Sequence, residues 1–167
     1  MTPDEIHKGL QEKFPGVELK FEQKAGEPYI VVPGDQLVAV CRTLKTDPAL
    51  ALDCLMCLSG VDYKEYLESV YHLFSYGRRH KIVLKARCTR DNPHLPTVEG
   101  VWRTANWLER EAYDLVGIIY DGHSDLRRIM NPDDWKGHPL RKDYQEEADY
   151  RGIETTRENL LITGKIN

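Results

Sequence analysis

The stretch that decides the fold is YLESVYHLFSYGRRHKIVLKARC, residues 66–88. Residues 66–76 are apolar on both faces, which is typical of a strand in the interior of a sheet. From residue 82 to residue 88, apolar side chains recur with the period of two that indicates a second strand. Gly77-Arg78-Arg79-His80 lies between the two and predicts a tight turn. Residues 66–88 therefore predict a β-hairpin at the centre of a sheet.

Two helices are predicted before this hairpin. Thr2-Pro3-Asp4-Glu5 is a capping box with proline at the first helical position, and the helix that it begins ends near Phe14. Residues 36–45 place apolar side chains three and four positions apart, which predicts a second helix with Asp35 as its cap. Short apolar or alternating runs predict further strands over residues 17–21, 29–32 and the second half of residues 50–62.

One more helix is predicted after the hairpin. Residues 91–97 contain two prolines and are expected to form a loop. Residues 98–116 are predicted to be helical, in one or two pieces, with Gly117 as the residue that ends the helix. A short strand is expected over residues 118–120. The inward stripe of the helix is predicted to be Leu108, Ala112, Leu115 and Val116.

These elements define an α+β fold in which helices pack on a mostly antiparallel or mixed sheet. We assign that fold to residues 1–120. Periodicity disappears afterwards, and residues 121–167 are expected to form an extended, charged C-terminal segment that binds a partner and ends in a tail. Within it, Asn131-Pro132-Asp133-Asp134 resembles the start of a helix, with Asn131 as the cap.

Composition argues against several classes of protein. The 167 residues carry 23 basic and 27 acidic side chains, and the formal net charge of −4 argues against nucleic acid as the main partner. No apolar run approaches the roughly 18–20 residues that a membrane span needs. The acidic N-terminus lacks the features of a signal peptide. We expect a soluble, cytosolic chain that reaches a membrane only through a partner.

The motifs that usually carry chemistry are missing from the sequence. It contains no glycine-rich phosphate cradle, no G-x-S-x-G and no H-E-x-x-H. Cys54 and Cys57 form a C-x-x-C, but no further ligand stands at a spacing suited to zinc or an iron–sulfur cluster. Because free cysteine is usually buried, we predict that this pair packs in the core, as do Cys41 and Cys88. Redox or metal use of the pair is the alternative.

Two histidines stand among acids and arginines. His123 lies between Asp121 and Asp125 and could bind a metal or act as a base, and His138 has similar surroundings. No nucleophile or third ligand accompanies them. We therefore favour a histidine that fixes a turn by hydrogen bonds. A free-standing metalloenzyme that uses His123 and His138 is the distant alternative.

The end of the last helix and the segment after it are densely charged. Arg110 and Asp114 are four residues apart and are expected to pair on the helix surface. Residues 125–144 alone hold four acids and five bases, together with Trp135. Such a dense and nearly neutral mixture of charged side chains is not suited to form a hydrophobic core within this segment. It suits an interface in which arginines bind carboxylates and a tryptophan acts as an anchor.

The same stretch resembles a known family. Glu109-Arg110-Glu111-Ala112-Tyr113-Asp114-Leu115, then Gly117-Ile118, then Gly122-His123-Ser124-Asp125-Leu126-Arg127-Arg128-Ile129 are similar to the signature of the 30 kDa subunit of respiratory complex I, which in bacteria is the C subunit of NADH-quinone oxidoreductase. Residues 134–144 resemble the family segment that follows, and a looser similarity begins near residue 50. Ser124 and Gln145 stand where the family usually has proline, and Ser124 is expected to loosen the turn before Asp125. The chain is also short for the family.

The resemblance implies a non-catalytic structural subunit of the peripheral arm, on the cytoplasmic side of the inner membrane. Such a subunit holds no cofactor or metal of its own, whereas partner subunits hold FMN and iron–sulfur clusters. It packs against the quinone-reducing 49 kDa-type subunit of a complex that moves electrons from NADH to quinone and exports protons. The interface residues that the resemblance implies are Glu109, Arg110, Glu111, Asp114, His123, Asp125, Arg127, Arg128, Trp135, His138, Arg141, Lys142, Asp143 and Tyr144.

A related assembly is the close alternative. Energy-converting hydrogenases and ferredoxin- or deazaflavin-dependent oxidoreductases use similar subunits, and this sequence does not separate them from complex I. Under the complex I assignment, reversing Arg127 and Arg128 to glutamate is expected to release the subunit from its complex while the isolated domain still folds.

Overall fold

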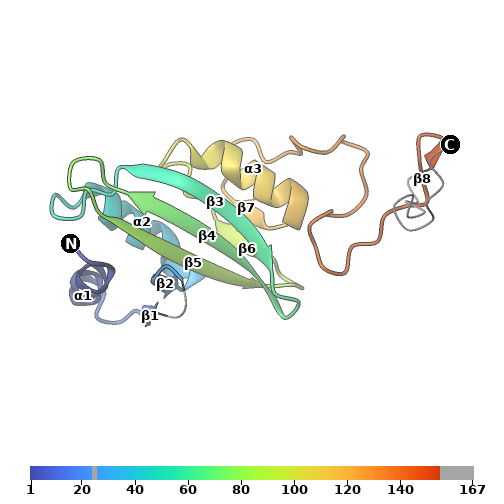
Figure 1. Cartoon of the computed structure of the whole chain (residues 1–167). Coiled ribbons are helices and arrows are strands. Elements are labelled where there is room, and N and C mark those ends of the chain that lie inside the picture. Colours follow the sequence, from blue (N-terminus) through green and yellow to red (C-terminus); the bar gives the residue numbers. More distant parts are fainter. Residues whose placement is uncertain (24–25, 155–167) are drawn as a thin grey trace, which may run out of the picture.

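A computed structural model describes residues 1–23 and 26–154 of the chain. Its main element is a five-stranded sheet with the order β1-β2-β5-β4-β3 (Figure 1). The predicted hairpin forms the middle of this sheet, where β4 (Tyr66–Phe74) and β5 (Lys81–Thr89) run antiparallel. Tyr66 lies opposite Thr89, and Phe74 lies opposite Lys81. The prediction made from residues 66–88 is therefore confirmed.

The outer strands make the sheet mixed. β3 (Cys54–Asp62) pairs antiparallel with β4, while β2 (Tyr29–Val32) pairs parallel with β5. β1 (Lys20–Glu22) is the antiparallel neighbour of β2. It is shorter than the strand predicted over residues 17–21, because the chain bends before Lys20 and buries Leu19 in the core. With helices on a mixed sheet, the predicted α+β class is confirmed.

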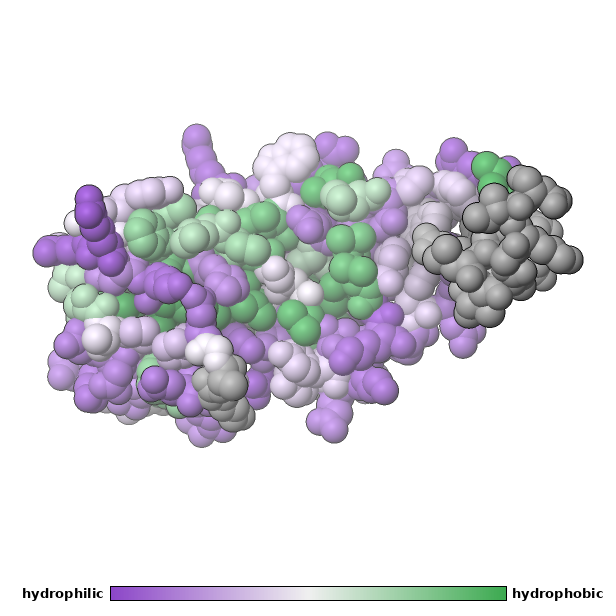
Figure 2. Space-filling model, in the orientation of Figure 1, coloured by the Kyte–Doolittle hydropathy of each residue, from purple (hydrophilic) through white to green (hydrophobic). Residues whose placement is uncertain are grey.

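One face of the sheet forms the core and the other is open. Leu67, Tyr71 and Leu84 are fully buried on the inner face. Figure 2 shows the open face, on which hydrophobic residues gather in a band over β3 and β4 and hydrophilic residues lie below it.

The four cysteines divide between the two faces. Cys41 and Cys88 are buried as predicted, but the prediction that Cys54 and Cys57 pack in the core is wrong. Cys54 is half-buried and Cys57 is exposed. A β-bulge between Leu55 and Cys57 shifts the register of β3 against β4, so both cysteines of the C-x-x-C lie on the open face although they are three residues apart.

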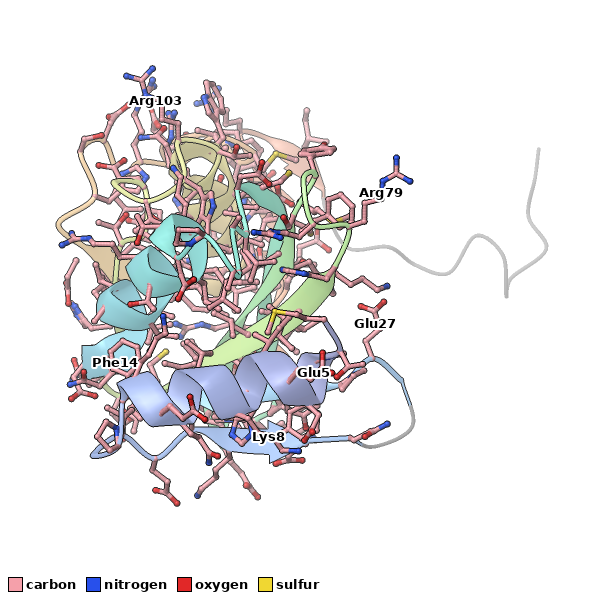
Figure 3. The ribbon with its side chains drawn as sticks, turned by 90° about the vertical axis from the view of Figure 1, so that its left-hand side faces the viewer. Glu5, Lys8, Phe14, Glu27, Arg79 and Arg103 are labelled. Atoms are coloured by element: carbon pink, nitrogen blue, oxygen red, sulfur yellow. The ribbon has the colours of Figure 1, made fainter. Side chains whose placement is uncertain are left out.

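Two helices cover the inner face. α1 (Pro3–Lys13) begins with the predicted capping box at Thr2, and α2 (Leu37–Thr46) follows a short 3₁₀ turn, η1 (Gly34–Gln36). The prediction that Asp35 caps this helix is wrong, because Asp35 lies inside the 3₁₀ turn and α2 starts without a side-chain cap. Figure 3 shows both helices from the side, with Glu5 and Lys8 on α1. In the described part of the chain, no helix is long and apolar enough to cross a bilayer.

The third helix is shorter than predicted. α3 (Ala105–Val116) starts seven residues after residue 98, because residues 98–104 form turns. Gly117 ends it with a φ of +81°, as expected for the residue after a helix. α3 packs closely behind β3: a Cβ atom at Gly60 would lie 3.1 Å from a methyl group of Val116.

Two small sheets lie outside the main sheet. β6 (His94–Pro96) and β7 (Ile119–Asp121) pair in parallel, so residues 91–97 are not wholly the predicted loop. β8 (Asp149–Tyr150) and β9 (Ile153–Glu154) form a short antiparallel pair. The helix start predicted at Asn131 is wrong, since residues 131–144 form turns and bends. The predicted tail falls in part on residues 155–167, outside the described residues.

Candidate functional site

The charged residues of α3 turn inward rather than outward. Glu109, Arg110 and Asp114 are buried, and only Glu111 of this group is exposed. The predicted surface pair of Arg110 and Asp114 is wrong, because each bonds to a different part of the segment that follows α3. That segment, residues 122–144, is called the capping segment below.

Asp114 is the centre of the best-connected site. One carboxylate oxygen accepts hydrogen bonds from the backbone N–H groups of Ile129, Met130 and Asn131 at 3.0, 2.7 and 2.8 Å. The other accepts from Nη1 of Arg128 at 2.7 Å and from the side-chain amide of Asn131 at 2.9 Å. Burial opposes the charge, but the bonds from Asn131, Arg128 and Met130 outweigh burial and lower the pKa of Asp114 to about 2.

The capping segment also satisfies the C-terminal end of α3. A helix leaves its last carbonyl groups without partners inside the helix, and its dipole favours positive charge there. Arg128 donates to the Asp114 carbonyl, the Leu140 N–H to the Leu115 carbonyl, and Arg141 to the Val116 and Gly117 carbonyls. Two cations predicted to face a partner thus bind the protein's own helix.

His138 completes this end of the helix. Its Nδ1 lies 3.0 Å from the Asp114 carbonyl oxygen, and its ring packs edge-on against Tyr113. Burial lowers the pKa of His138, and the nearby guanidinium groups of Arg141 and Arg128 add to this effect. The ring therefore acts as a neutral donor to the helix end.

The other end of the capping segment closes over the start of α3. Asp125 N–H donates to Nδ1 of His123 at 3.0 Å, so Nε2 of that ring carries the proton and donates to the Asn106 carbonyl at 3.0 Å. These are the bonds predicted for a histidine that fixes a turn. Ser124 donates its backbone N–H to Glu99 at 2.8 Å, a bond that proline cannot make. The expectation that Ser124 loosens this turn is therefore wrong.

The structure does not bring His123 and His138 together. His123 bonds near the first turn of α3, whereas His138 bonds at its last turn. Among residues 1–23 and 26–154, no group of three or more histidine, cysteine or acidic side chains is arranged to hold a metal ion. The geometry of these two histidines is that of loop anchors.

Arg110 links the capping segment to an exposed aromatic ring. Its guanidinium lies 4.1 Å from the centre of the Trp107 ring and donates to the Asn106 side chain at 2.7 Å and to Asp125 at 3.4 Å. A cation stacked on one face of the indole restrains the ring while its other face stays in solvent. Trp107 remains 62% exposed.

Glu109 is a buried acid with few donors. It accepts hydrogen bonds from the Val98 N–H at 2.8 Å and from the Thr97 hydroxyl, and its Oε2 lies 3.9 Å from Nε2 of His123. Burial raises the pKa of Glu109 to about 7, because these two bonds do not replace the lost hydration.

The stability of the fold should therefore depend on pH through Glu109. The unfolded chain releases this proton near pH 4.5, and the folded chain holds it to about pH 7. The contribution of Glu109 to the free energy of unfolding is fully present below pH 4.5 and is lost as the pH rises to 7. This change amounts to about 3 kcal/mol. Urea denaturation at the two pH values measures it, with Glu109→Gln as the control. If the difference in the free energy of unfolding between the wild type and Glu109→Gln stays constant with pH, this assignment is wrong.

A second buried acid anchors the far end of the capping segment. Asp62, at the end of β3, accepts from the backbone N–H of Lys142 at 2.9 Å and from the guanidinium of Arg90. Arg90 also pairs with Asp143 at 2.6 Å. Burial opposes the charge of Asp62, but the bonds from Arg90, Lys142 and Lys64 lower its pKa to about 2. Lys142 and Asp143 are thus held against the β3–β4 hairpin.

The remaining predicted residues of the capping segment divide by exposure. Arg127 is exposed and pairs with Asp125 at 3.0 Å. Trp135 is half-buried against Tyr150, and Tyr144 is half-buried with its ring against Gly137. Sequence reasoning missed three exposed apolar side chains on α3 and the capping segment, because exposure depends on how the capping segment lies on α3. The outward set, called the α3 surface below, consists of Trp107, Arg127, Met130 and Leu140.

Comparisons with known proteins agree with one another. Residues 30–150 match the family model described as the 30 kDa subunit of respiratory-chain NADH dehydrogenase. The C subunit of the NADH-quinone oxidoreductase of Chlorobium phaeobacteroides is 43% identical over 148 residues, which cover 86% of this chain and 89% of that protein. The corresponding protein of Saccharopolyspora erythraea is 46% identical over 136 residues, which cover 77% of this chain but only 55% of that protein. Some of its relatives are therefore considerably longer.

Two solved structures share the fold. A trypsin-resistant fragment of Nqo5 superposes with a TM-score of 0.60 and 28% identity, covering 72% of this chain and 99% of the fragment. A chain of the membrane-bound sulfane sulfur reductase, an archaeal respiratory membrane complex, superposes with a TM-score of 0.69 and 28% identity, covering 87% of this chain and 86% of that one.

Proposed function

This chain belongs to the family of the 30 kDa subunit of respiratory-chain NADH dehydrogenase, and from that premise we propose that it is a structural subunit of a proton-translocating NADH:quinone oxidoreductase. Its role is to dock in the peripheral arm against the quinone-reducing 49 kDa-type subunit, on the cytoplasmic side of the membrane. Electrons pass through FMN and iron–sulfur clusters in partner subunits. The subunit itself contributes no catalytic group.

The use of the charged residues supports a docking role. Asp114, Arg128 and Arg141 bond to α3 or to the capping segment, and their geometry serves folding. A reaction centre would instead leave such groups converging on a space for a substrate. What α3 and the capping segment present to solvent is the α3 surface, in which Met130 is 61% and Leu140 is 59% exposed. Large apolar side chains and arginine are the residues that interfaces favour.

A related respiratory assembly is the second candidate. The structural likeness to a chain of the membrane-bound sulfane sulfur reductase shows that this fold also serves in a complex with another activity. The partners separate the two candidates. Co-purification with flavin- and NADH-binding subunits supports NADH oxidation, whereas a nickel-iron hydrogenase large subunit or a ferredoxin-dependent partner supports the alternative.

The test of docking uses Arg127 and Met130. Arg127 and Arg128 have different surroundings. Arg127 is exposed, whereas Arg128 is mostly buried and bonds to Asp114. Replacing Arg128 with glutamate would therefore disturb the fold itself. Arg127→Glu with Met130→Glu should leave the melting temperature unchanged and release the chain from its complex. Loss of a central apolar anchor and a reversed charge typically weaken an interface by about 2–4 kcal/mol, or roughly 30- to 1000-fold.

The control applies the same chemical changes elsewhere. Arg42→Glu with Ile153→Glu changes one exposed arginine and one exposed apolar residue outside the α3 surface. A tag on the 49 kDa-type partner allows the complex to be purified. The control variant should co-purify with this partner normally, and its membranes should reduce quinone at the normal rate. If the Arg127 and Met130 variant also assembles normally, the α3 surface is not the docking surface.

A further inference from the structure

The open face of the sheet is less polar than a face in contact with water usually is. The outward residues of β3 are Cys54, Met56, Cys57, Ser59 and Val61, and none of them is charged. A sheet with one solvated face normally alternates apolar side chains inward with polar ones outward. Met56 is nevertheless 59% exposed, and the neighbouring Cys57 and Ser59 are exposed too.

The uncharged region continues onto β4. Val70 lies opposite Ser59 and Phe74 opposite Cys54, so apolar side chains from two adjacent strands meet on this face. Figure 2 shows hydrophobic residues gathered in a band over these strands, with some hydrophilic residues between them. An open groove of about 320 Å³ lies at one end of it, between Met56, Cys57, His72 and Val83. A contiguous apolar patch of this kind usually marks an interaction site and not a surface that stays in solvent.

A row of cations borders the apolar region along β5. Lys85 and Arg87 both pair with one carboxylate, Glu68, at 3.0 and 2.7 Å, so two positive charges share one negative charge. Arg87 keeps part of its guanidinium in solvent. Lys81 pairs with Glu27, which also faces His72. The margin of the face therefore carries a surplus of positive charge.

We propose that this open face of β3 and β4 is a second docking surface, covered in the assembled complex by an element of a neighbouring subunit that has an apolar face and an acidic flank. The apolar side would lie over Met56 and Cys57, and the acidic flank over Lys85 and Arg87. The proposal rests on the proposed function, because it needs an assembly. α3 packs on the opposite face of the sheet, so the two docking surfaces face different neighbours and the subunit bridges them.

A second copy of this chain fits the face less well. Its matching face would bring another row of lysine and arginine against the first. Among the described residues, the carboxylates beside these cations, Glu68 and Glu27, are already paired with them, and Glu22 of β1 accepts a hydrogen bond from Tyr29. Charge complementarity therefore favours a different, acidic partner.

Cys57 provides a natural probe of this surface. Its thiol is exposed on the face, whereas Cys41 and Cys88 are buried and their thiols have raised pKa values because of that burial. A maleimide should label Cys57 rapidly in the isolated full-length chain and about tenfold or more slowly in the purified complex, since an interface core excludes water and reagents. Peptide mass spectrometry distinguishes Cys57 from Cys54. Equal labelling rates in the chain and in the complex would overturn the proposal.

Variants on β3 then identify the neighbour. Met56→Glu with Ser59→Glu places two charges at exposed positions, and Gln11→Glu with Gln145→Glu places the same charges elsewhere. The β3 variant should melt like the wild type and lose the subunit that a Cys57-directed cross-linker captures. It should keep the subunit that Arg127→Glu with Met130→Glu loses, and the control should keep both. A cross-link to a second copy, or loss of one and the same subunit in both variants, would refute the bridge.

The two proposals fail in different ways. If the chain co-purifies with no other subunit, the proposed function fails. If it co-purifies normally while Cys57 stays freely reactive, only the second docking surface fails.

Discussion

Gly117→Ala is expected to lower the free energy of unfolding by about 3 kcal/mol. Gly117 has a φ of +81°, a backbone conformation that costs a residue with a Cβ atom roughly 1–2 kcal/mol. The added Cβ would also lie 2.5 Å from Cδ2 of His138 and 2.6 Å from Nη2 of Arg141. Both side chains bond to the end of α3, so they cannot give way without releasing carbonyl groups of the helix.

Gly9→Ala is the matched control for this experiment. The same atom is added in the middle of α1, where nothing lies within 4 Å of the new Cβ. Alanine favours a helix over glycine, so this variant should be more stable by about 0.5–1 kcal/mol. Urea denaturation of the two variants should therefore give opposite signs. A Gly117→Ala chain as stable as the wild type would show that the capping segment does not pack on Gly117.

The hairpin could be predicted because its determinants are local. A run that is apolar on both faces, a tight turn and a period-two pattern occupy 23 consecutive residues, and no distant segment is needed to complete them. The pairing of β6 with β7 could not be predicted in the same way. Each strand has three residues, they pair in parallel, and 22 residues of the chain separate Pro96 from Ile119. The short strand predicted over residues 118–120 is confirmed by β7, but nothing in residues 91–97 distinguishes its partner strand β6 from a loop.

The orientation of α3 shows a second limit. Hydrophobic periodicity placed Leu108 and Leu115 in its inward stripe, but both are only half-buried, whereas Glu109 and Asp114 are fully buried. A buried acid is tolerable when donors surround its charge, as residues 128–131 do for Asp114, or when it is held protonated, as burial beside residues 97–98 favours for Glu109. Periodicity cannot register partners so far away. The family resemblance rests on residues 109–144, and only the three-dimensional structure divides these residues between those that fold the segment and those that remain exposed.

The same division predicts the largest effect of a single conservative change, which is Asp114→Asn. The variant keeps the size of the side chain but replaces one acceptor oxygen with an NH₂ donor. In either orientation of the amide, that donor meets buried donors: the three backbone N–H groups of residues 129–131, or Arg128 together with the Asn131 amide. The free energy of unfolding should fall by about 4 kcal/mol, because buried donors and a guanidinium lose the carboxylate to which they bond.

The loss should be confined to the capping segment at first, because Asp114 holds that segment and not the sheet. Hydrogen exchange should speed up at the amides of Ile129, Met130 and Asn131, while the amides of β4 and β5 keep their protection. Glu111→Gln, on the exposed side of the same helix, is the control and should change stability by less than about 0.5 kcal/mol. Since Asp114 binds the amide of Met130 itself and Arg127 lies two residues before the first bound amide, the Asn variant should also leave its complex, although no residue of the α3 surface has been altered. Retention of Asp114→Asn in the complex with rapid exchange at residues 129–131 would show instead that the partner, and not Asp114, orders this segment.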